Sequence, residues 1–414
     1  MPPAAKPPLM TLDEALNRLL SAVPPQLADA PVDVSTFDTL GRVLACDVTS
    51  LLDVPPADNS AMDGYALRLA DAPAVGSELP VSQRVPAGVV PQALQPGTAA
   101  RIFTGAQVPP GADVVVMQEH CTALEGGKVR VDRELRLGQN IRRRGEDVRH
   151  GAVVLRRGKR LDAQSLGMAA SVGAATLQVA RRPRVALFST GDELVMPGEP
   201  LRPGAIYNSN RYTLRGLLQA MGCECVDLGI VPDKLEATRA ALRQAAISSD
   251  LILTSGGVSV GEEDHLRPAL EAEGRLEFWQ IAMKPGKPLA FGQVNRSEGG
   301  PVRYIGLPGN PVSSFMTFLL AVRPVLLRLQ GAADLGMRPS LLRAAFDWHK
   351  ADMRREFLRV RRTAQGELEL FPNQSSGVLT STVWGDGVVD NPGGQSIRRG
   401  DFVSFISFAE LLAC

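Results

Sequence analysis

The chain has 414 residues and a mass of 44.2 kDa, which is too long for one ordinary hydrophobic core and predicts roughly two to four domains. Lys and Arg number 45 against 44 Asp and Glu, so the formal net charge is +1, and this balance argues against a dedicated nucleic-acid-binding protein. With 44% hydrophobic and 21% charged residues, the composition is that of a globular protein.

The cysteines and the most apolar segment indicate a protein of a reducing compartment without a membrane span. The number of cysteines, five, is odd, and no secretory apolar segment precedes them, so we expect no disulfide scaffold and a cytoplasmic location. The stretch 315–329 contains Arg323 and Pro324 and is too short to span a bilayer. Cys223 and Cys225 form a CxC pair that could ligate a metal, although a strand is the plainer interpretation.

The N-terminal part of the chain combines helical and β-rich segments. Thr11 and Glu14 have the spacing of a capping box, and apolar residues follow one helical face up to Val23, which predicts a helix that ends at Pro24. A second periodic stretch runs from 32 to about 48, and residues 161–172 are predicted to be helical. Between them, the region 65–160 contains short Val-rich runs interrupted by Gly and Pro, at 112–118, 128–131 and 152–155. This pattern predicts a small β domain.

From about residue 181 the pattern changes to alternating strands and helices. Strands are predicted at 185–189, 225–230, 251–254, 278–283, 289–294 and 302–307. Helices are expected to begin near Asn208, Asp233 and Glu262, and a long helix is expected over 312–329. This alternation predicts βαβ units with a mostly parallel sheet. After residue 331 the strands shorten again, at 357–360, 368–371 and 402–408, which indicates a C-terminal β domain.

Three predicted strands end in turns of similar chemistry. These turns are STGDE at 189–193, SGGVSVGEED at 255–264 and GLPGNP at 306–311. In a parallel sheet such turns share the carboxyl edge, where ligands bind. Glycines let backbone amides approach a ligand closely, and helix N-termini favour anions such as phosphate. Each turn alone is typical of any βα connection, but the three together predict a site for an anion or a nucleotide.

Carboxylates and lysines in and near these turns add a second signal. Glu193 and Asp264 follow the glycines and Asp233 follows the second strand, which suits Mg²⁺ held by carboxylates and substrate phosphates. Asp233 also has capping-box spacing to Glu236, so a purely structural role stays open. Lys284 and Lys287, in the sequence MKPGKP, suit a phosphate or another oxyanion, with a solvated turn as the plainer alternative.

Two further motifs have competing interpretations. GVSVG at 257–261 matches the nucleophile elbow of serine hydrolases, with Ser259 at its centre. However, His265 is too close in sequence for the usual order of a catalytic triad, and His349 lies in the separate β region. Three arginines at 142–144 could bind phosphate, although such charge runs usually form a solvated face. The chain contains no Walker A motif and no G-x-G-x-x-G fingerprint.

Seven motifs occur in an order that is typical of one family. They are SAMDGYA (60–66), IFTGA (102–106), NIRRRGED (140–147), STGDEL (189–194), SGGVSVG (255–261), KPGKP (284–288) and GLPGNPVS (306–313). Together they resemble the molybdopterin molybdenumtransferases, the MoeA family that includes the gephyrin E domain, from about residue 9 to the C-terminus. One stretch departs from the pattern, because GEEDH follows VSV where many members carry a single acid and an aromatic residue.

The resemblance implies a transferase that inserts molybdate into the dithiolene of adenylylated molybdopterin with Mg²⁺ and releases AMP, a late step of molybdenum cofactor biosynthesis. It implies an elongated homodimer in which each chain has four domains: a discontinuous dimerisation domain (9–50 and 146–181), an inserted β domain (51–145), a MogA-like α/β domain that binds molybdopterin or nucleotide (182–330) and a C-terminal β domain (331–414). It also implies molybdopterin adenylyltransferase and molybdoenzyme chaperones as further partners, and no nucleic acid or membrane.

Site residues follow from the same resemblance, motif by motif. The implied catalytic residues are Asp63, Thr104, Glu193, Asp233, Asp264, Lys284 and Lys287, and the implied metal ligands are Glu193 and Asp264. The implied substrate-binding residues are Arg142, Ser255, Gly256, Gly257, Ser259, Pro308, Gly309, Asn310, Pro311 and Ser375. The active cleft is expected between the α/β domain of one subunit and the inserted domain of the other, where Asp63 and Thr104 have no partner chemistry within their own domain. Glu262 and Glu263 could compete for the metal.

Two alternative functions stay open. One is a related protein that binds or adenylylates molybdopterin without inserting metal, and the other is a scaffold, a role that the gephyrin E domain also has. The motifs of the inserted region favour metal insertion, because an α/β domain alone suffices for adenylylation. The lack of an appended partner-binding domain in this sequence argues against a scaffold.

Overall fold

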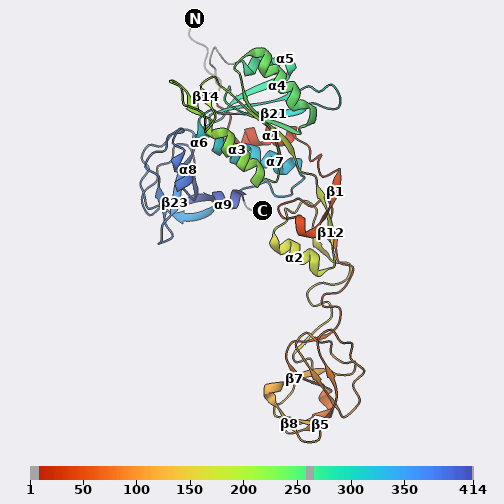
Figure 1. Cartoon of the computed structure of the whole chain (residues 1–414). Coiled ribbons are helices and arrows are strands. Elements are labelled where there is room, and N and C mark those ends of the chain that lie inside the picture. Colours follow the sequence, from red (N-terminus) through yellow and green to blue (C-terminus); the bar gives the residue numbers. More distant parts are fainter. Residues whose placement is uncertain (1–8, 258–264, 413–414) are drawn as a thin grey trace. The chain divides into compact units, whose positions relative to one another are not determined.

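The computed structural model describes residues 9–257 and 265–412. The chain divides into two compact units (Figure 1). The first unit contains the residues up to 46, 157–162 and 178–414, and the second contains 47–156 and 163–177. The second unit is therefore inserted into the first in the sequence, and the chain passes between the two units four times.

The second unit is built on a six-stranded sheet. Its order is β7-β4-β6-β5-β9-β8, with β4 (Gly64–Leu67), β5 (Glu78–Val85), β6 (Ala99–Ile102), β7 (Val114–Met117), β8 (Cys121–Leu124) and β9 (Lys128–Val131). Two strand pairs, β2 (Val48–Thr49) with β11 (Val153–Leu155) and β3 (Asn59–Ser60) with β10 (Ile141–Arg142), and helix α2 (Ala163–Ser171) complete it. The predicted β domain is confirmed. Strand β5 escaped prediction because Gln83 interrupts the apolar face that Leu79, Val81 and Val85 form.

The first unit contains an α/β domain with a six-stranded mixed sheet. Its order is β16-β13-β17-β21-β20-β18, with β13 (Arg184–Thr190), β16 (Glu224–Val231), β17 (Leu251–Ser255), β18 (Gly274–Gln280), β20 (Pro288–Val294) and β21 (Val302–Leu307). The first four strands are parallel, as predicted, whereas β20 is antiparallel to both of its neighbours, β21 and β18. The strand predicted at 278–283 is corrected, because β18 ends at Gln280 and the separate β19 (Met283–Lys284) pairs with the C-terminal sheet.

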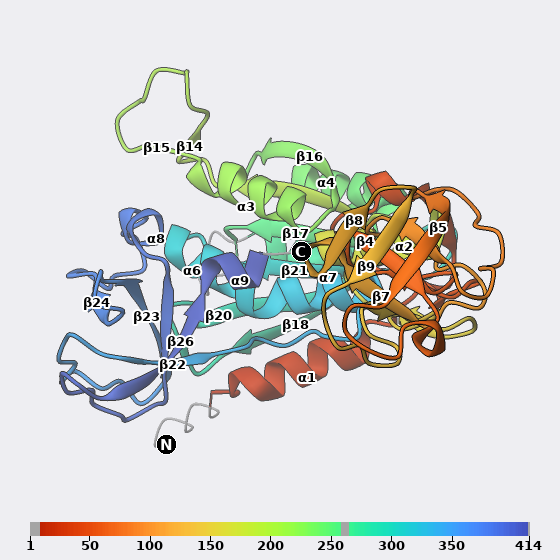
Figure 2. The ribbon, with the colours of Figure 1, turned by 90° about the horizontal axis from the view of Figure 1, so that it is seen from below.

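Helices cover both faces of this sheet (Figure 1), and Figure 2 looks onto one of these two helical layers. Along β13, Val185 and Leu187 pack in one core with α1 (Leu12–Ala22), α3 (Ser209–Ala220) and the helix at 311–329. The alternate residues Ala186 and Phe188 pack in a second core with α4 (Leu235–Ser248) and α5 (Leu266–Glu273). A strand that is buried on both faces reads as a continuous apolar run, as this one does.

The helix predicted at 312–329 consists of α6 (Pro311–Thr317), a π-helical turn (Phe318–Val322) and α7 (Arg323–Leu329). Among the described residues this is the one helical segment that is long and apolar enough to cross a membrane, but 94% of that window is buried inside the protein. The guanidinium of Arg323 donates hydrogen bonds to the carbonyl oxygens of Leu411, Leu335 and Gly336. The segment is therefore a core helix of the first unit.

The C-terminal part of the first unit is a six-stranded sheet. It contains β19, β22 (Ser340–Arg343), β23 (Arg355–Arg362), β24 (Leu368–Leu370), β25 (Gly387–Asn391) and β26 (Phe402–Ser407), with the short helices α8 (Thr380–Trp384) and α9 (Phe408–Leu412). The predicted C-terminal β domain is confirmed. In the periodic stretch from 32 to 48, β1 (Pro31–Ser35) pairs with β12 (Thr176–Ala180) and residues 36–38 form a short 3₁₀ turn.

Helix α1 begins with the predicted capping box. Thr11 Oγ1 accepts a hydrogen bond from Glu14 N at 3.2 Å, and Glu14 Oε2 accepts one from Thr11 N at 2.9 Å. We expect Thr11→Ala to lower the free energy of unfolding by about 1 kcal/mol, because the first helical turn loses a side-chain acceptor. Urea denaturation measures this change. Glu14→Gln, which keeps an acceptor for Thr11 N, should cost less, and equal losses for both variants would contradict this explanation.

Candidate active site

The predicted Gly- and Ser-rich turns meet at one edge of the α/β sheet. Strand β13 pairs in parallel with β17, and β17 with β21, so Ser189 lies opposite Ser255 and Ser255 opposite Leu307. Strand β16, the next strand of this sheet along the chain after β13, pairs with one side of β13, and the following strand, β17, pairs with the other side. The direction in which strands are added therefore reverses at β13, which makes this position a topological switch point. Open α/β sheets bind their ligands at such a point. The expectation of a shared edge is therefore confirmed.

A cavity of about 500 Å³ opens at this edge. Its lining contains six of the residues named from the sequence, namely Glu193, Ser255, Gly256, Gly309, Asn310 and Pro311. The remaining lining residues are Thr190, Leu194, Ile206, Tyr207, Asn208, Ser209, Asn210 and Gly377. The first thirteen of these lining residues along the chain belong to the α/β domain, whereas Gly377 comes from the C-terminal part of the chain.

The glycines after β17 are required by close backbone packing. Gly256 has φ +92°, and a Cβ atom there would lie 2.7 Å from the carbonyl oxygen of Thr190. Gly257 has φ +66°, and its Cβ would lie 2.8 Å from Thr190 Oγ1. Side chains rarely adopt these φ values, so both positions favour glycine sterically and conformationally. A Cβ on Gly309 would lie 3.9 Å from Gly256 Cα, which shows how closely the second and third turns approach each other.

Asn210, near the start of α3, connects two of the turns and was not predicted from the sequence. Its Nδ2 donates hydrogen bonds to Ser255 Oγ and to the carbonyl oxygen of Gly309, both at 2.7 Å. Two positions earlier, Asn208 caps α3 as predicted, because its side chain accepts a hydrogen bond from Arg211 N. The only sequence signal for Asn210 is a second Asn just inside the predicted helix, which is an unusual position for that residue.

Acidic side chains gather near Glu193, which lines the cavity. Burial raises the pKa of Asp233, and the carboxylates of Asp192 and Glu193 raise it further, while His265 opposes this through its charge and a backbone hydrogen bond. Asp233 N also donates to Asp192 Oδ1 at 3.3 Å. The predicted helix start at Asp233 is corrected: α4 begins at Leu235 after Lys234, without a side-chain cap, because Asp233 faces these groups instead.

The acidic donor set near Glu193 fits a hard divalent cation. Three carboxylates lie near enough for two of them to raise the pKa of the third, and oxygen atoms are the ligands that Mg²⁺ prefers. No group of three or more metal-ligating side chains is complete within residues 9–257 and 265–412. A Mg²⁺ ion held by one or two carboxylates and by substrate phosphates would not need such a group, so the metal site stays a prediction.

The raised pKa of Asp233 predicts a change in stability on neutralisation. Because the pKa of Asp233 is higher in the folded than in the unfolded protein, ionising this carboxyl group costs more in the folded state. The folded state is therefore not penalised at a pH below the unfolded pKa of Asp, and it loses stability as the pH rises through the folded pKa. We therefore expect Asp233→Asn to raise the melting temperature near pH 7 in buffer without divalent cations, with a difference that disappears towards pH 4. Thermal melts at both pH values measure this. The control variant Glu236→Gln, an exposed acid paired with Arg239, should bring no such gain, and a lower melting temperature for Asp233→Asn would contradict the prediction.

Several residues named from the sequence fall outside the described residues. Ser259 and Asp264 belong to 258–264, as do Glu262 and Glu263. The nucleophile hypothesis for Ser259 and the metal-ligand role of Asp264 therefore stay predictions. Gly257 is the last described residue of that turn.

The two lysines after β18 do not line the cavity. Lys284 Nζ forms ion pairs with Glu356 Oε1 at 3.1 Å and with Asp352 Oδ2 at 3.5 Å in the C-terminal part of the chain. Lys287 is exposed. Between them, a Cβ on Gly286 would lie 2.7 Å from Thr317 Oγ1, so the turn packs tightly on α6. Lys284 is thus held at the junction of the two sheets of the first unit.

In the second unit, Asp63, Thr104 and Arg142 lie on neighbouring segments. Asp63 Oδ1 accepts hydrogen bonds from Thr104 N at 2.7 Å and from Thr104 Oγ1 at 2.8 Å, and these bonds lower the pKa of Asp63. The expectation that Asp63 and Thr104 lack a partner within their own domain is therefore wrong, because each is the partner of the other. Arg142 lies on β10 beside Asn59 of β3, and Ser60 O accepts a hydrogen bond from Gly105 N.

The arginine cluster at 142–144 separates into two kinds of residue. Arg143 pairs with Asp58 and Arg144 with Asp53, each at 2.6 Å. Arg142 is exposed and has no ion pair within the described parts of the chain. Structural ion pairs thus account for two of the three side chains, and the arginine that the resemblance singles out is the one whose guanidinium is available to a ligand.

The C-terminal part of the chain reaches the cavity through the turn that contains Ser375. Ser375 N donates to Asn373 Oδ1 at 3.0 Å, and the carbonyl oxygen of Ser376 accepts a hydrogen bond from Val312 N at 3.0 Å. Gly377, two residues further on, lines the cavity. Pro308 is buried behind Gly309 and is not among the lining residues.

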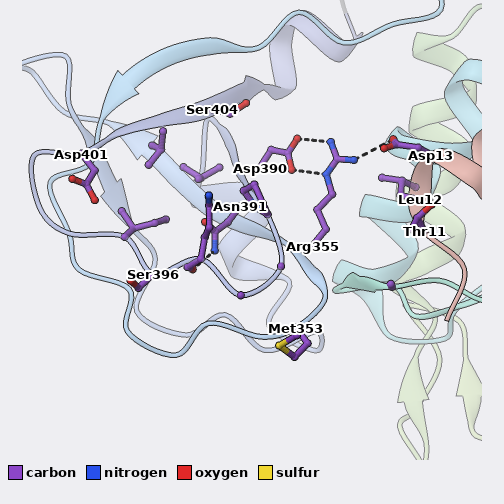
Figure 3. Close-up of a pocket in the computed structure, with 18 of the residues that line it drawn as sticks. Thr11, Leu12, Asp13, Met353, Arg355, Asp390, Asn391, Ser396, Asp401 and Ser404 are labelled. Atoms are coloured by element: carbon purple, nitrogen blue, oxygen red, sulfur yellow. Dashed lines mark hydrogen bonds and ion pairs between the residues drawn. The ribbon is translucent and has the colours of Figure 1, made fainter. Parts of the chain in front are cut away.

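A larger cavity of about 1230 Å³ lies between the start of α1 and the C-terminal sheet (Figure 3). Arg355 forms ion pairs there with Asp390 at 2.6 Å and with Asp13 at 3.2 Å, so its charge is compensated within the protein. None of the site residues predicted from the sequence lines this cavity. The CxC pair offers no site either, because Cys223 is buried and burial raises the pKa of its thiol to about 12, which disfavours the thiolate that binds metals.

An open parallel sheet with glycine-rich turns and carboxylates at its switch point defines a protein that binds an anionic, nucleotide-like ligand. Three family models match successive parts of the chain: the MoeA N-terminal region (domain I and II) at 10–173, a probable molybdopterin binding domain at 186–328 and the MoeA C-terminal region (domain IV) at 342–408. The chain belongs to the molybdopterin molybdenumtransferase (MoeA) family.

Similar proteins cover nearly the whole chain. A molybdopterin molybdenumtransferase of Haemophilus influenzae is 39% identical over 381 residues, which is 91% of this chain and 92% of that protein. One of a Nostoc species is 38% identical over 84% of this chain and 81% of that protein. The crystal structure of a MoeA protein from Pyrococcus horikoshii has a TM-score of 0.83 at 30% identity and covers 97% of this chain and 100% of that one.

Proposed function

We propose that this protein is a molybdopterin molybdenumtransferase, which inserts molybdate into adenylylated molybdopterin and releases AMP late in molybdenum cofactor biosynthesis. The observation that carries the proposal is the cavity at the switch point, where residues of three predicted turns line one space. Family membership and the relatives' names support the reaction type.

The cavity offers different groups to the two ends of such a substrate. The backbone amides of the turns after β17 and β21 suit the phosphate link. Leu194, Ile206 and Tyr207 give the cavity an apolar side that suits a planar ring. Asn210, which also lines the cavity, orients both turns through its bonds to Ser255 and Gly309.

The carboxylates would hold Mg²⁺, and bound Mg²⁺ would supply the positive charge that two anionic reactants need in order to approach each other. Among the described residues, Glu193 and Asp233 are our proposed ligands, with Asp192 beside them and Asp264 as a further ligand expected from the sequence. Lys284 and Lys287 are proposed to bind the oxyanion. Because Glu356 and Asp352 hold Lys284, an oxyanion would have to compete with them or bind beside them.

We further propose a cytoplasmic homodimer with composite active sites. Asp63, Thr104 and Arg142 would come from the second unit of one subunit, and the cavity from the first unit of the other. The free guanidinium of Arg142 and the oriented pair of Asp63 and Thr104 support this proposal, because they form a polar group that faces solvent. Molybdopterin adenylyltransferase and molybdoenzyme chaperones are the proposed protein partners.

One experiment separates this function from its alternatives. Purified protein is incubated with adenylylated molybdopterin, molybdate and Mg²⁺, and AMP release is followed together with reconstitution of a molybdenum-free molybdoenzyme. We expect both signals, and both should require molybdate. Formation of the adenylate from ATP and molybdopterin would instead identify an adenylylating protein. Binding of the adenylate without turnover would favour a scaffold.

A further inference from the structure

Arg359, on β23 in the C-terminal sheet, is buried without a carboxylate partner among the residues that the structure describes. Only 1% of its surface is exposed, and its guanidinium donates to Ser381 Oγ at 3.2 Å, to the carbonyl oxygen of Ser375 at 3.2 Å and to that of Phe357 at 3.3 Å. Burial lowers the pKa of Arg359 to about 10, so the side chain is still charged at neutral pH. An unpaired buried charge is costly, and a protein keeps one where the charge or its hydrogen bonds serve a purpose.

The hydrogen bonds of Arg359 converge on one turn, residues 373–378. Besides the bond from the guanidinium to Ser375, the side chain of Gln374 accepts from Arg359 N at 2.9 Å and donates to the carbonyl oxygen of Arg359 at 3.0 Å. Ser381 Oγ, which accepts from Arg359, donates in turn to the carbonyl oxygen of Val378 at 2.7 Å. Arg359 thus contacts the turn near its start through Gln374 and Ser375, and its end through Ser381.

The 373–378 turn also accepts a hydrogen bond from the start of α6, next to the cavity. Asn310, the residue before the helix, makes no capping bond with its side chain, and Pro311 has no amide hydrogen. Val312 N is therefore the first free donor of α6, and it binds the carbonyl oxygen of Ser376. Gly377 of the turn and both Asn310 and Pro311 line the cavity. A shift of this turn would move one wall of the cavity and uncover the helix end.

We infer that Arg359 is a positioning residue for the active site: it holds the 373–378 turn, whose Gly377 lines the cavity, against the first turn of α6, and no carboxylate among the described residues neutralises its charge. A carboxylate partner would satisfy the guanidinium equally well but would cancel its charge, whereas carbonyl and hydroxyl acceptors leave the charge in place. The identity of the anion that benefits rests on the proposed function, but the role of Arg359 in placing the turn does not.

The test compares Arg359→Gln and Arg359→Lys with the control Arg361→Gln. Arg361 lies on the same strand, is partly exposed and pairs with Glu369 at 3.0 Å. For AMP release, we expect Arg359→Gln to raise KM for adenylylated molybdopterin about tenfold, as for loss of a charge-assisted hydrogen-bond set, with a smaller change in kcat. Arg359→Lys, which keeps the charge but has a single nitrogen, should fall between Arg359→Gln and the unaltered protein. Unchanged KM in Arg359→Gln would overturn the inference and leave the proposed function intact.

Hydrogen exchange tests the same inference without turnover. Peptides covering 311–316 and 373–378 should exchange faster in Arg359→Gln, while peptides from β25 and β26 keep their protection. Faster exchange throughout the C-terminal sheet would show a merely structural role and overturn the inference. Should the Arg359 variants not fold, Gln374→Ala removes the other attachment of the turn and should raise both KM and local exchange; no change in either would likewise overturn it.

Discussion

Glu193→Gln is expected to lower the rate of AMP release by about two powers of ten or more, as for other preorganised charge-stabilising groups. Glu193 lines the cavity, and its carboxylate adds to the negative charge that raises the pKa of Asp233. Replacing it with the neutral amide removes a proposed Mg²⁺ ligand. The concentration of Mg²⁺ that gives half-maximal activity should therefore rise together with the fall in kcat.

A control variant for this prediction is available in the loop that contains Glu193. Glu199 is an exposed acid in the same loop, and its hydrogen bonds to Met196 and Tyr207 are made by its backbone. Glu199→Gln should keep normal turnover and normal Mg²⁺ dependence. The melting temperature of Glu193→Gln should not fall, because an exposed carboxylate contributes little to the core. If Glu193→Gln turned over normally at limiting Mg²⁺, the proposed metal site would have to lie elsewhere.

Mixing two inactive variants should restore activity, and this is the second large effect that we expect. Asp63→Asn changes the second unit and Glu193→Gln changes the first, so each variant alone should be nearly inactive. In a randomly mixed dimer with composite sites, one of the two active sites contains no altered residue. Half of the dimers are then mixed, and about a quarter of the full activity should return.

The control for this experiment is a second pair of variants that alter the same half of the site. Mixing Asp63→Asn with Thr104→Ala should restore nothing, because both changes fall in the second unit and every composite site then contains one of them. A lack of restoration in the first mixture, with exchange of subunits demonstrated, would mean that each site is built within one chain. Both measurements use AMP release by subunits that were dissociated, mixed and reassociated.

The sequence predicted which turns form the site and where the helices are capped, but it did not predict all the contacts between the site residues. The turns at 189–193, 255–257 and 306–311 could be placed at one edge because parallel strands of a βαβ pattern end at the same side of a sheet. The capping residues Thr11 and Asn208 were also predictable, because a cap depends on contacts within one turn of the helix.

Local patterns failed where a distant segment supplies the partner. Asp233 has capping-box spacing to Glu236, yet it contacts Asp192 and His265 instead, so α4 begins later than predicted. Likewise, Asp63 and Thr104 are separated by 41 positions, and only the pairing of β4 with β6 in the second unit brings them together.

The amino-acid sequence by itself determined the family, the α/β and β composition and the set of anion-binding turns, because ordered motifs and strand periodicity are local properties of the chain. The tertiary structure alone decided which residues work together. Asn210 joins Ser255 to Gly309 across 45 and 99 positions, and Arg359 reaches the cavity through Ser375 and α6. Neither residue belongs to a motif with a local signature, since its hydrogen-bond partners become neighbours only when the strands and helices pack.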